Sequence, residues 1–291
     1  MSIKHLVLSG GGPSMIQLLG SIQHLESVGF LDLKKIESIF ATSAGSIVGV
    51  LIGLKFDWQT INDYILKRPW HELFKIKVDK IFEAFSKRGI FGADIIEKCF
   101  KPLFAAKDLP LTLTLLDFYA YNNIELHFFA FEINEFEMED ISYLTHPETT
   151  LLSAIHMTCS LPVLVAPVIV NDKMYIDGGI RGNYPLKYCI DSGKCADEIL
   201  GFKNRYNTEI DKKRLGVESS LLDFVLFLLF KIIFSLNTDK AQPMIKYECI
   251  CNTDTMNVEG MKMALSRVET RKQIFANGVD DAKSFCVKMG L

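Results

Sequence analysis

Two successive segments near the N-terminus follow the order strand, tight turn, helix, and this repeat constrains the fold more than any other feature. Residues 3–8 form a short apolar run, a glycine-rich stretch interrupts it at residues 10–13, and residues 14–28 carry apolar side chains at helical spacing. Residues 36–40 predict a second strand, which a turn joins to an apolar helix at residues 46–54. Two such units in succession predict an α/β fold with a parallel sheet and crossover helices.

The rest of the chain extends this pattern without an internal repeat or a Pro/Ser-rich linker. Residues 57–109 are expected to be mainly helical, with a break at residues 88–92. The later elements expected are two strands, a short helix and a hairpin that turns at Asn171-Asp172, at residues 111–115, 125–132, 153–157 and 163–176. We therefore expect a single domain over residues 1–291, with a core at about 1–190 and a C-terminal helical extension at 191–291 packed on it.

The composition of the chain limits which binding partners and which cell compartment are expected. The chain has 291 residues, of which 49% are hydrophobic, and its net charge of −3 provides no basic excess to neutralise phosphates, so nucleic acid is not an expected partner. Seven cysteines are dispersed along it, and Cys249 and Cys251 lack a second pair or a nearby histidine at zinc-site spacing. No apolar leader precedes the first glycines, so we expect a cytoplasmic protein with reduced thiols, no metal and no cofactor.

Ser43 lies at the turn between the second predicted strand and its helix. A serine on such a sharp turn projects its hydroxyl above the sheet, at the positive end of the following helix, where it can act as a nucleophile. The turn needs small residues two positions before and two positions after the serine, and Ala41 and Gly45 meet this need. Ordinary strand-to-helix turns have the same pattern, so this motif alone does not establish a nucleophile.

Gly10, Gly11 and Gly12 follow the first predicted strand and allow two interpretations. In the first, the amides of consecutive glycines converge without side-chain obstruction and form an oxyanion hole. In the second, the loop binds a dinucleotide, because the first and third glycines match half of that fingerprint and Asp32 lies at a tolerable distance for a ribose contact. Met15 counts against the second, because it stands where close helix–strand packing needs another glycine.

Asp177 ends an apolar strand and precedes two glycines, which leaves its carboxylate uncovered at the edge of the sheet. Asp-Gly also initiates turns, and this interpretation of the isolated motif is equally good. A Ser–Asp–His order with Asp177 as the acid is excluded, because every histidine precedes it: His5, His24, His71, His127, His146 and His156. A Ser–Asp dyad, in which the carboxylate itself takes the serine proton, is the economical alternative to a triad built on an earlier acid and one of the last three histidines.

Taken together and in this order, the motifs resemble the patatin-like phospholipase family. GGG at residues 10–12 resembles the family's oxyanion loop, TSAGS at residues 42–46 its nucleophile elbow, and DGG at residues 177–179 its aspartate motif. TCSLPVLVAP at residues 158–167 resembles the proline-bearing run that leads into the aspartate hairpin. The resemblance covers about residues 3–185.

The resemblance implies a three-layer α/β/α sandwich with a mostly parallel central sheet, no catalytic metal or cofactor, and fatty-acyl esters of phospholipids or lysophospholipids as substrates. Carried over by position, Ser43 attacks the ester carbonyl and Asp177 removes the proton of the serine. The oxyanion is then held by backbone amides of the loop and the elbow, drawn from Gly10, Gly11, Gly12 and Ala44.

Two positions depart from the family's pattern. Ala41 replaces the first glycine of the elbow, a change that adds only a methyl group. PSM at residues 13–15 stands where many members carry a basic residue followed by glycine, which weakens the expected oxyanion or head-group contact. The alternatives are therefore a catalytically weak or inactive membrane-associated protein of the same fold, and a nucleotide-binding α/β domain.

Two further segments follow the motifs. The first runs from Leu221 to Leu236 and consists almost wholly of Leu, Phe, Ile and Val, interrupted by Asp223 and Lys231. It is shorter than the roughly 20 residues needed to span a bilayer, which leaves a buried cap helix, an interfacial membrane contact and a true span as interpretations. The second, residues 267–288, alternates charged and apolar residues and predicts a solvated surface helix.

Overall fold

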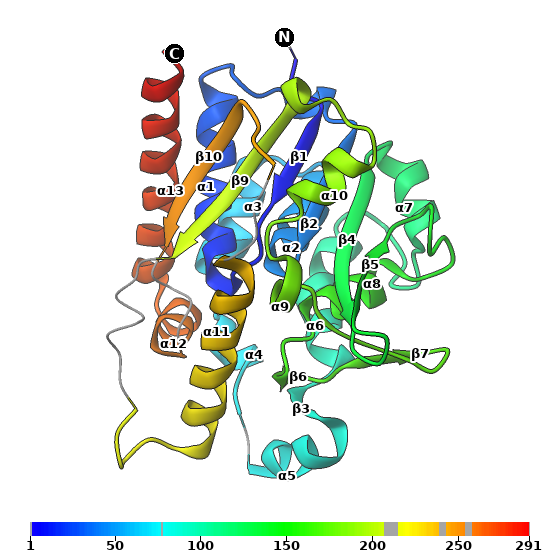
Figure 1. The fold of residues 1–291 in the computed structure, drawn as a ribbon, viewed down its shortest axis with the longest axis vertical. Helices are drawn as coiled ribbons and strands as arrows, with labels where there is room; N and C mark the ends of the chain where they lie inside the picture. The colour runs from blue at the N-terminus through cyan, green and yellow to red at the C-terminus, as the bar shows by residue number, and fades with distance from the viewer. Residues whose placement is uncertain (1, 77, 207–214, 239–242, 254–257, 291) are drawn as a thin grey trace.

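The computed structural model describes residues 2–76, 78–206, 215–238, 243–253 and 258–290. Within these residues the main sheet has eight strands, of which seven are linked in the order β10-β9-β1-β2-β4-β8-β7, while β5 pairs with β4 (Figure 1). The bounds of these strands, in chain order, are β1 (His5–Leu8), β2 (Ser38–Thr42), β4 (Glu125–Glu132), β5 (Glu137–Ile141), β7 (Val168–Val170), β8 (Lys173–Asp177), β9 (Ile199–Tyr206) and β10 (Tyr247–Thr253). A second, two-stranded sheet pairs β3 (Gly89–Phe91) with β6 (Val163–Val165).

The sheet is mostly parallel, as the repeated strand–turn–helix unit predicted. β10, β9, β1, β2 and β4 all run in the same direction. β5 and β8 pair antiparallel with β4, and β7 pairs antiparallel with β8. Every residue of β1 and β2 is buried, because a parallel sheet has helices on both of its faces.

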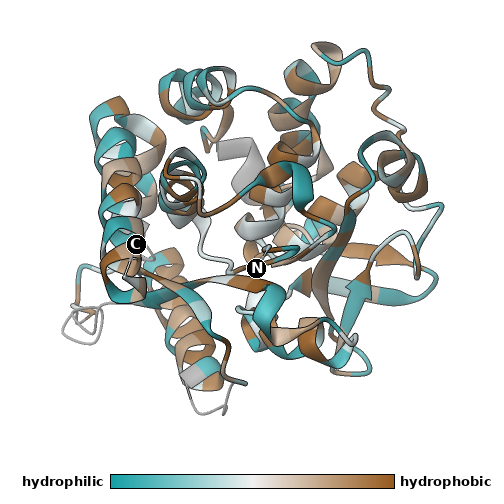
Figure 2. Ribbon diagram, turned by 90° about the horizontal axis from the view of Figure 1, so that it is seen from above, coloured by the Kyte–Doolittle hydropathy of each residue, from teal (hydrophilic) through white to brown (hydrophobic). Residues whose placement is uncertain are grey.

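Helices on the two faces of the sheet complete a three-layer α/β/α sandwich (Figures 1 and 2). One face carries α1 (Met15–Ser27), α2 (Ala44–Gly53), α8 (Leu151–Cys159) and α13 (Val268–Met289), and the other side carries α9 (Gly179–Gly182), α10 (Leu186–Asp191) and α11 (Leu221–Thr238). The side chains of β1 alternate accordingly: Leu6 and Leu8 join the large core of the first face, and Val7 joins the smaller core of the second.

The remaining helices surround this sandwich. They are α3 (Trp58–Asn62), α4 (Trp70–Leu73), α5 (Val78–Lys87), α6 (Ala93–Ala105), α7 (Leu115–Asn122) and α12 (Val258–Ser266). The stretch at residues 57–109 is therefore mainly helical as expected, and β3 lies at the expected break. Within the residues that the structure describes, no helix combines the length and the apolar character that crossing a membrane requires.

The strand expected at residues 111–115 was wrong. The structure has only an isolated bridge there, between Thr114 and Thr150, and α7 begins at Leu115. Thr114 caps this helix in a capping box with Asp117, in which each side chain accepts from the other residue's backbone amide. Local capping of the helix start thus outweighed the strand-like composition of residues 111–115.

The expected boundary near residue 190 does not separate a core from a helical extension. The later part of the chain supplies β9, which pairs with β1, and β10, which pairs with β9. Its terminal helix α13 is also more than a solvated surface helix, because Ile274, Gly278 and Phe285 are among its buried residues. The C-terminal third therefore completes the sheet and covers one of its faces.

α13 packs unusually close to α1 because glycines lie at the contact. A methyl group on Gly20 would overlap the carbonyl oxygen of Phe275, and one on Gly278 would overlap the carbonyl oxygen of Gln17. The Ser21 hydroxyl donates to the Gly278 carbonyl at 2.8 Å, which fixes the register of the two helices. Backbone atoms line this contact, so a side chain cannot simply rotate away to make room.

We predict that Gly278→Ala lowers the free energy of unfolding by about 2 kcal/mol, measured by urea denaturation. Alanine favours a helix by about 1 kcal/mol over glycine, so only steric overlap with α1 can reverse the sign. Gly216→Ala is the matched control, because nothing lies within 4 Å of its added methyl group, and it should change stability by less than about 0.5 kcal/mol. Equal effects of the two substitutions would contradict the close packing of α1 and α13.

Candidate active site

Ser43 and Asp177 meet because two strands share one edge of β4. β2 pairs with residues 125–129 of β4 in the parallel sense, and β8 pairs with residues 130–132 in the antiparallel sense. β5 occupies the opposite edge, so β2 and β8 lie end to end and run toward each other. Thr42 ends β2 and Asp177 ends β8 at adjacent positions of β4, which brings the next residue, Ser43, beside the aspartate.

Ser43 occupies a strained turn at the start of α2. Its backbone has φ 51° and ψ −128°, a conformation that a non-glycine residue rarely adopts. Its hydroxyl donates to Oδ2 of Asp177 at 2.6 Å. Gly45 makes the turn possible, because a side chain there would lie 2.7 Å from the carbonyl oxygens of Leu8 and Ser9, whereas Ala41 is buried in β2 with its methyl group in the core. Position 45 therefore requires glycine, whereas position 41 accommodates the methyl group of alanine.

Asp177 is buried, with 5% of its surface exposed. Burial raises its pKa from 3.8 to about 6, and hydrogen bonds from the Ser43 hydroxyl and the Gly179 amide oppose this rise because they favour the carboxylate. The Gly179 amide donates to Oδ1 at 2.7 Å, so each carboxylate oxygen has one donor. At neutral pH the group is an ionised carboxylate with a higher proton affinity than an ordinary aspartate.

The last turn of α8 holds the main chain of both residues. The Thr158 hydroxyl accepts from the Ser43 amide at 2.8 Å and donates to the Phe129 carbonyl at 2.6 Å. The Ser160 carbonyl accepts from the Asp177 amide at 2.9 Å. Thr158 and Ser160 lie in the 158–167 run, but their roles depend on where α8 ends relative to β4, and nothing in the sequence reveals that.

The glycine loop follows β1 directly beside Ser43. Gly11 and Gly12 have φ values of 153° and 54°, which favour glycine. Within the described residues, no acceptor is assigned to the amides of these two glycines or to that of Ala44. Gly10 differs, because its amide donates to the Asn183 carbonyl at 3.0 Å. An added methyl group on Gly10 would lie 3.0 Å from Cβ of Ser43, so glycine at this position allows the loop to approach Ser43 closely.

Three polar side chains fix the carbonyl of Gly10, and the sequence motifs did not include them. Asn204 Nδ2, Asn183 Nδ2 and the Tyr206 hydroxyl donate to this oxygen at 2.8, 3.1 and 3.1 Å. Asn204 also donates to the Ser14 hydroxyl at 2.7 Å. Asn183 follows the DGG motif by only a few residues, a weak local signal, whereas Asn204 and Tyr206 reach the loop only because β9 pairs with β1.

The three histidines considered for a catalytic triad, His127, His146 and His156, form hydrogen bonds to residues other than Ser43 and Asp177. His156 Nε2 lies 3.0 Å from the Ala166 carbonyl, and His127 Nδ1 lies 2.7 Å from an oxygen of Asp140. Among the described residues no histidine is assigned a hydrogen bond to Ser43 or Asp177. Of these described residues, likewise, no group of three His, Cys, Asp or Glu side chains could hold a metal ion, and all seven cysteines are free thiols.

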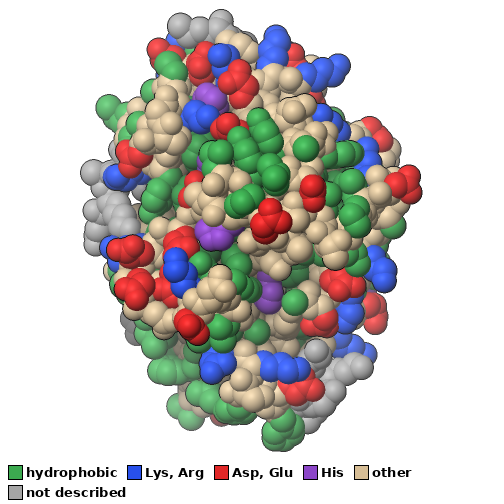
Figure 3. All heavy atoms as spheres, turned by 90° about the vertical axis from the view of Figure 1, so that its right-hand side faces the viewer, with side chains coloured by type: hydrophobic (Ala, Val, Ile, Leu, Met, Phe, Trp, Pro, Cys, Tyr) green, Lys and Arg blue, Asp and Glu red, His purple; other side chains and the backbone are tan. Residues whose placement is uncertain are grey.

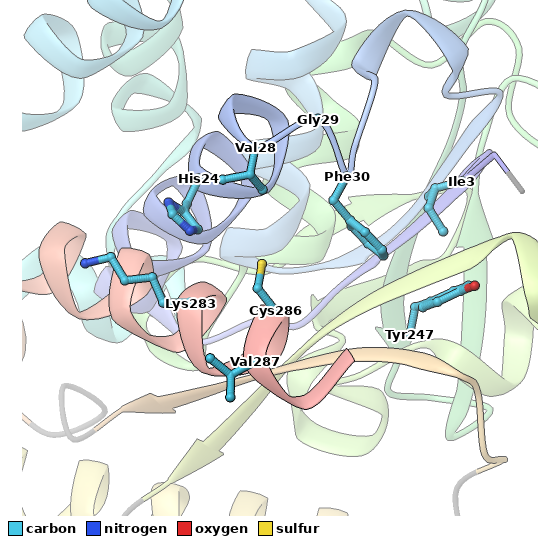
Figure 4. A pocket seen from close by; sticks show the side chains of 9 residues that line it. All are labelled: Ile3, His24, Val28, Gly29, Phe30, Tyr247, Lys283, Cys286 and Val287. Atoms are coloured by element: carbon cyan, nitrogen blue, oxygen red, sulfur yellow. The ribbon is translucent and has the colours of Figure 1, made fainter. Parts of the chain in front are cut away.

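A cavity of about 590 Å³ lies away from these residues, between the C-terminal end of α1, the start of β10 and α13 (Figure 4). Phe30, Tyr247, His24, Lys283 and Cys286 are among its lining residues. β10 begins at Tyr247, whereas Ser43 follows the end of its strand, so the cavity lies at the opposite end of the parallel strands. It is not part of the candidate site.

Comparisons with known proteins agree with the fold and the motifs. A model of the patatin-like phospholipase family matches residues 6–190, and the chain belongs to this family. It is 26% identical over 212 residues to a probable lipid hydrolase of Invertebrate iridescent virus 6, covering 70% of this chain and 71% of that protein. An uncharacterized protein of Acanthamoeba polyphaga mimivirus is 24% identical over 232 residues, covering 78% and 74%. The nucleotide-binding alternative loses its basis.

A solved structure supports the same architecture. The crystal structure of VipD from Legionella pneumophila aligns with a TM-score of 0.57 and 17% identity, covering 99% of this chain and 67% of that chain. At this identity the similarity establishes the fold alone. The three-layer sandwich that the sequence motifs implied is therefore confirmed.

We predict that Asp177→Asn stabilises the protein at neutral and alkaline pH. The pKa of Asp177 is about 6 in the folded state and 3.8 without burial. Ionisation of this carboxyl group therefore costs more in the folded protein than in the unfolded one, and the free energy of unfolding falls as pH rises from 3.8 through about 6. Removing the charge should therefore raise the free energy of unfolding by on the order of 2 kcal/mol at about pH 8. Urea denaturation of both proteins across this range is the measurement. The difference should shrink as pH falls through about 6, and a difference independent of pH would contradict the assignment.

Proposed function

We propose that the chain is a lipid acyl hydrolase that cleaves fatty-acyl esters of phospholipids or lysophospholipids through a Ser43–Asp177 dyad. The observation that carries this proposal is the 2.6 Å hydrogen bond from the Ser43 hydroxyl to a buried carboxylate at the end of the parallel strands. Membership of the patatin-like phospholipase family and the similarity to a probable lipid hydrolase support the reaction class.

The reaction divides into acylation and deacylation. In acylation, Oγ of Ser43 attacks the ester carbonyl while Oδ2 of Asp177 takes the hydroxyl proton, and Asp177 then gives this proton to the leaving alcohol. In deacylation, Asp177 removes a proton from water, which attacks the acyl-enzyme, and Asp177 then returns this proton to Oγ of Ser43 as the fatty acid leaves. A pKa raised to about 6 suits this role, because the carboxylate is ionised at neutral pH yet is a stronger base than an ordinary aspartate.

Charge that develops on the carbonyl oxygen needs backbone donors. The amides of Gly11, Gly12 and Ala44 are the candidates. Ala44 follows Ser43 in the chain, and the two glycines follow Gly10, which approaches Ser43. Among the described residues these three amides have no acceptor. The Gly10 amide is a weaker candidate, because the Asn183 carbonyl already accepts its proton. Ser14 stands near the position where many family members carry a basic residue, and its hydroxyl helps to anchor the loop through Asn204. This arrangement favours a working oxyanion hole over an inactive protein of the same fold.

We predict that Ser43→Ala and Asp177→Asn each reduce fatty-acid release from phosphatidylcholine vesicles and lysophosphatidylcholine micelles by at least about 1,000-fold. Ser46→Ala is the matched control: this serine is buried one turn away, and its hydroxyl has no partner within the described residues. The control should keep the parent's kcat. Retained activity in either dyad variant refutes the dyad. A parent that releases no fatty acid and does not react with a fluorophosphonate probe refutes the hydrolase itself.

We further propose that α11 contacts a lipid surface. One face of this helix leaves five apolar side chains between 44% and 74% exposed, at spacings of three and four residues: Leu221, Phe224, Leu228, Ile232 and Leu236. Phe82 and Phe85 of α5 are also exposed, and exposed Arg88 follows this helix in the chain. α11 and α5 both lie at the lower end of the molecule in Figure 1, toward which the parallel strands point, and hydrophobic side chains gather at that end in Figure 3. The same end carries Ser43.

The combined substitution Leu228→Gln and Ile232→Gln should weaken co-sedimentation with phosphatidylcholine vesicles by at least about 10-fold, because each side chain contributes on the order of 1 kcal/mol when it leaves water. Leu116→Gln with Leu144→Gln is the control. These leucines, in α7 and just after β5, are 44% and 62% exposed and lie outside α11. Equal losses in the two double variants would refute a docking face on α11.

A further inference from the structure

The inner face of α11 covers the segments that carry the candidate site. Leu226, Phe230 and Ile233 are buried in a small apolar cluster of their own. Residues packed against this cluster come from the segment between α8 and β6, from β6, from α9 and from β9, namely Leu161, Leu164, Ile180 and Tyr206. The helix is thus apolar on both sides, with one side against the site and the other exposed.

Asn237, near the end of α11, bonds to the segment that follows Asp177. Its Oδ1 accepts from the Asn183 amide at 3.1 Å, and its Nδ2 donates to the Gly179 carbonyl at 3.0 Å. Gly179 is the residue whose amide holds Oδ1 of Asp177. Asn183 in turn accepts from the Gly10 amide and donates to the Gly10 carbonyl. One side chain of α11 therefore braces both the aspartate turn and the glycine loop.

A second contact joins the same helix to the same loop. The ring of Phe234 lies 4.8 Å from the ring of Tyr206, measured between centroids. The Tyr206 hydroxyl donates to the Gly10 carbonyl and accepts from Asn183 Nδ2 at 3.0 Å. A displacement of α11 would disturb both routes together, because Phe234 and Asn237 lie one turn apart on one rigid helix.

We propose that α11 couples contact with a lipid bilayer to the geometry of the glycine loop, with Asn237 as the positioning residue. This inference rests on the hydrolase proposed above. Lipid that covers the outer face of α11 favours the position in which the helix is packed on the site, because its exposed apolar side chains then leave water. In that position Asn237 orders Asn183, and Asn183 orders the loop beside Ser43. The bilayer is chosen over a second copy of the chain because the exposed face lies at the end that presents Ser43.

The rate at which Ser43 reacts with a soluble fluorophosphonate probe measures this coupling without a lipid substrate. It is followed with and without phosphatidylcholine vesicles, for the full chain. Vesicles should accelerate the parent. Asn237→Ala should react about 10-fold to 100-fold more slowly than the parent in solution, and vesicles should accelerate it less, although it still co-sediments with them. Ser235→Ala, an exposed position on the same helix, should match the parent in every measurement.

Asn237→Asp is a second variant, which keeps the proposal testable even where Asn237→Ala does not fold. It keeps the oxygen that accepts from the Asn183 amide and loses the donor to the Gly179 carbonyl, so its rate should lie between those of the parent and Asn237→Ala. A purely structural role would lower the melting temperature but leave the ratio of rates with and without vesicles unchanged, and this result would overturn the proposal. So would parent-like labelling of Asn237→Ala, or dimerisation through α11 in place of vesicle binding. A parent that does not label at all overturns the hydrolase and this inference with it.

Discussion

One edge of β4 holds the candidate site together. β2 and β8 approach each other along this edge from opposite directions, and their ends lie at adjacent positions of β4. Side chains alone could not bring Ser43 and Asp177 to 2.6 Å, because these residues are 134 positions apart in the chain. The backbone hydrogen bonds that join β2, β4 and β8 bring the two residues together, and the helices on both faces of the sheet shield these hydrogen bonds from water. This edge therefore supports the rest of the site.

The site concentrates features that oppose folding. Ser43 has a positive φ, and Asp177 is an ionisable group taken out of water. Each is compensated locally: Thr158 binds the strained backbone of Ser43, and the Gly179 amide binds the buried carboxylate. The dense packing of α1 against α13 through Gly20 and Gly278 lies elsewhere and adds stability without touching the site. Strain at the site and compensation around it are what a preorganised catalytic centre requires.

Local signals explain which parts of the fold were predictable. Strand–glycine–helix units, the helix pattern at residues 46–54 and the Asn171-Asp172 turn all depend on neighbouring residues, and the structure has each of them. Prediction was wrong where competing local signals were close in strength, as at residues 111–115, where the Thr114 capping box prevailed over a strand. It was also wrong where the outcome depended on distant partners, as in the C-terminal third, whose two strands are stabilised by pairing with β1 and with each other.

The sequence by itself determined the three motifs of the candidate site: a serine on a strand-to-helix turn, glycines after a strand, and an aspartate at a strand end, in the order of the patatin-like phospholipase family. Each is set by short-range backbone sterics, so each is visible in a few consecutive residues. Tertiary structure decided everything that joins them. It selected Thr158, Asn183, Asn204 and Tyr206 as the side chains that hold the motifs, and it set α11 against the site. These choices depend on strand register and helix packing between residues far apart in the chain, and no short-range rule specifies them.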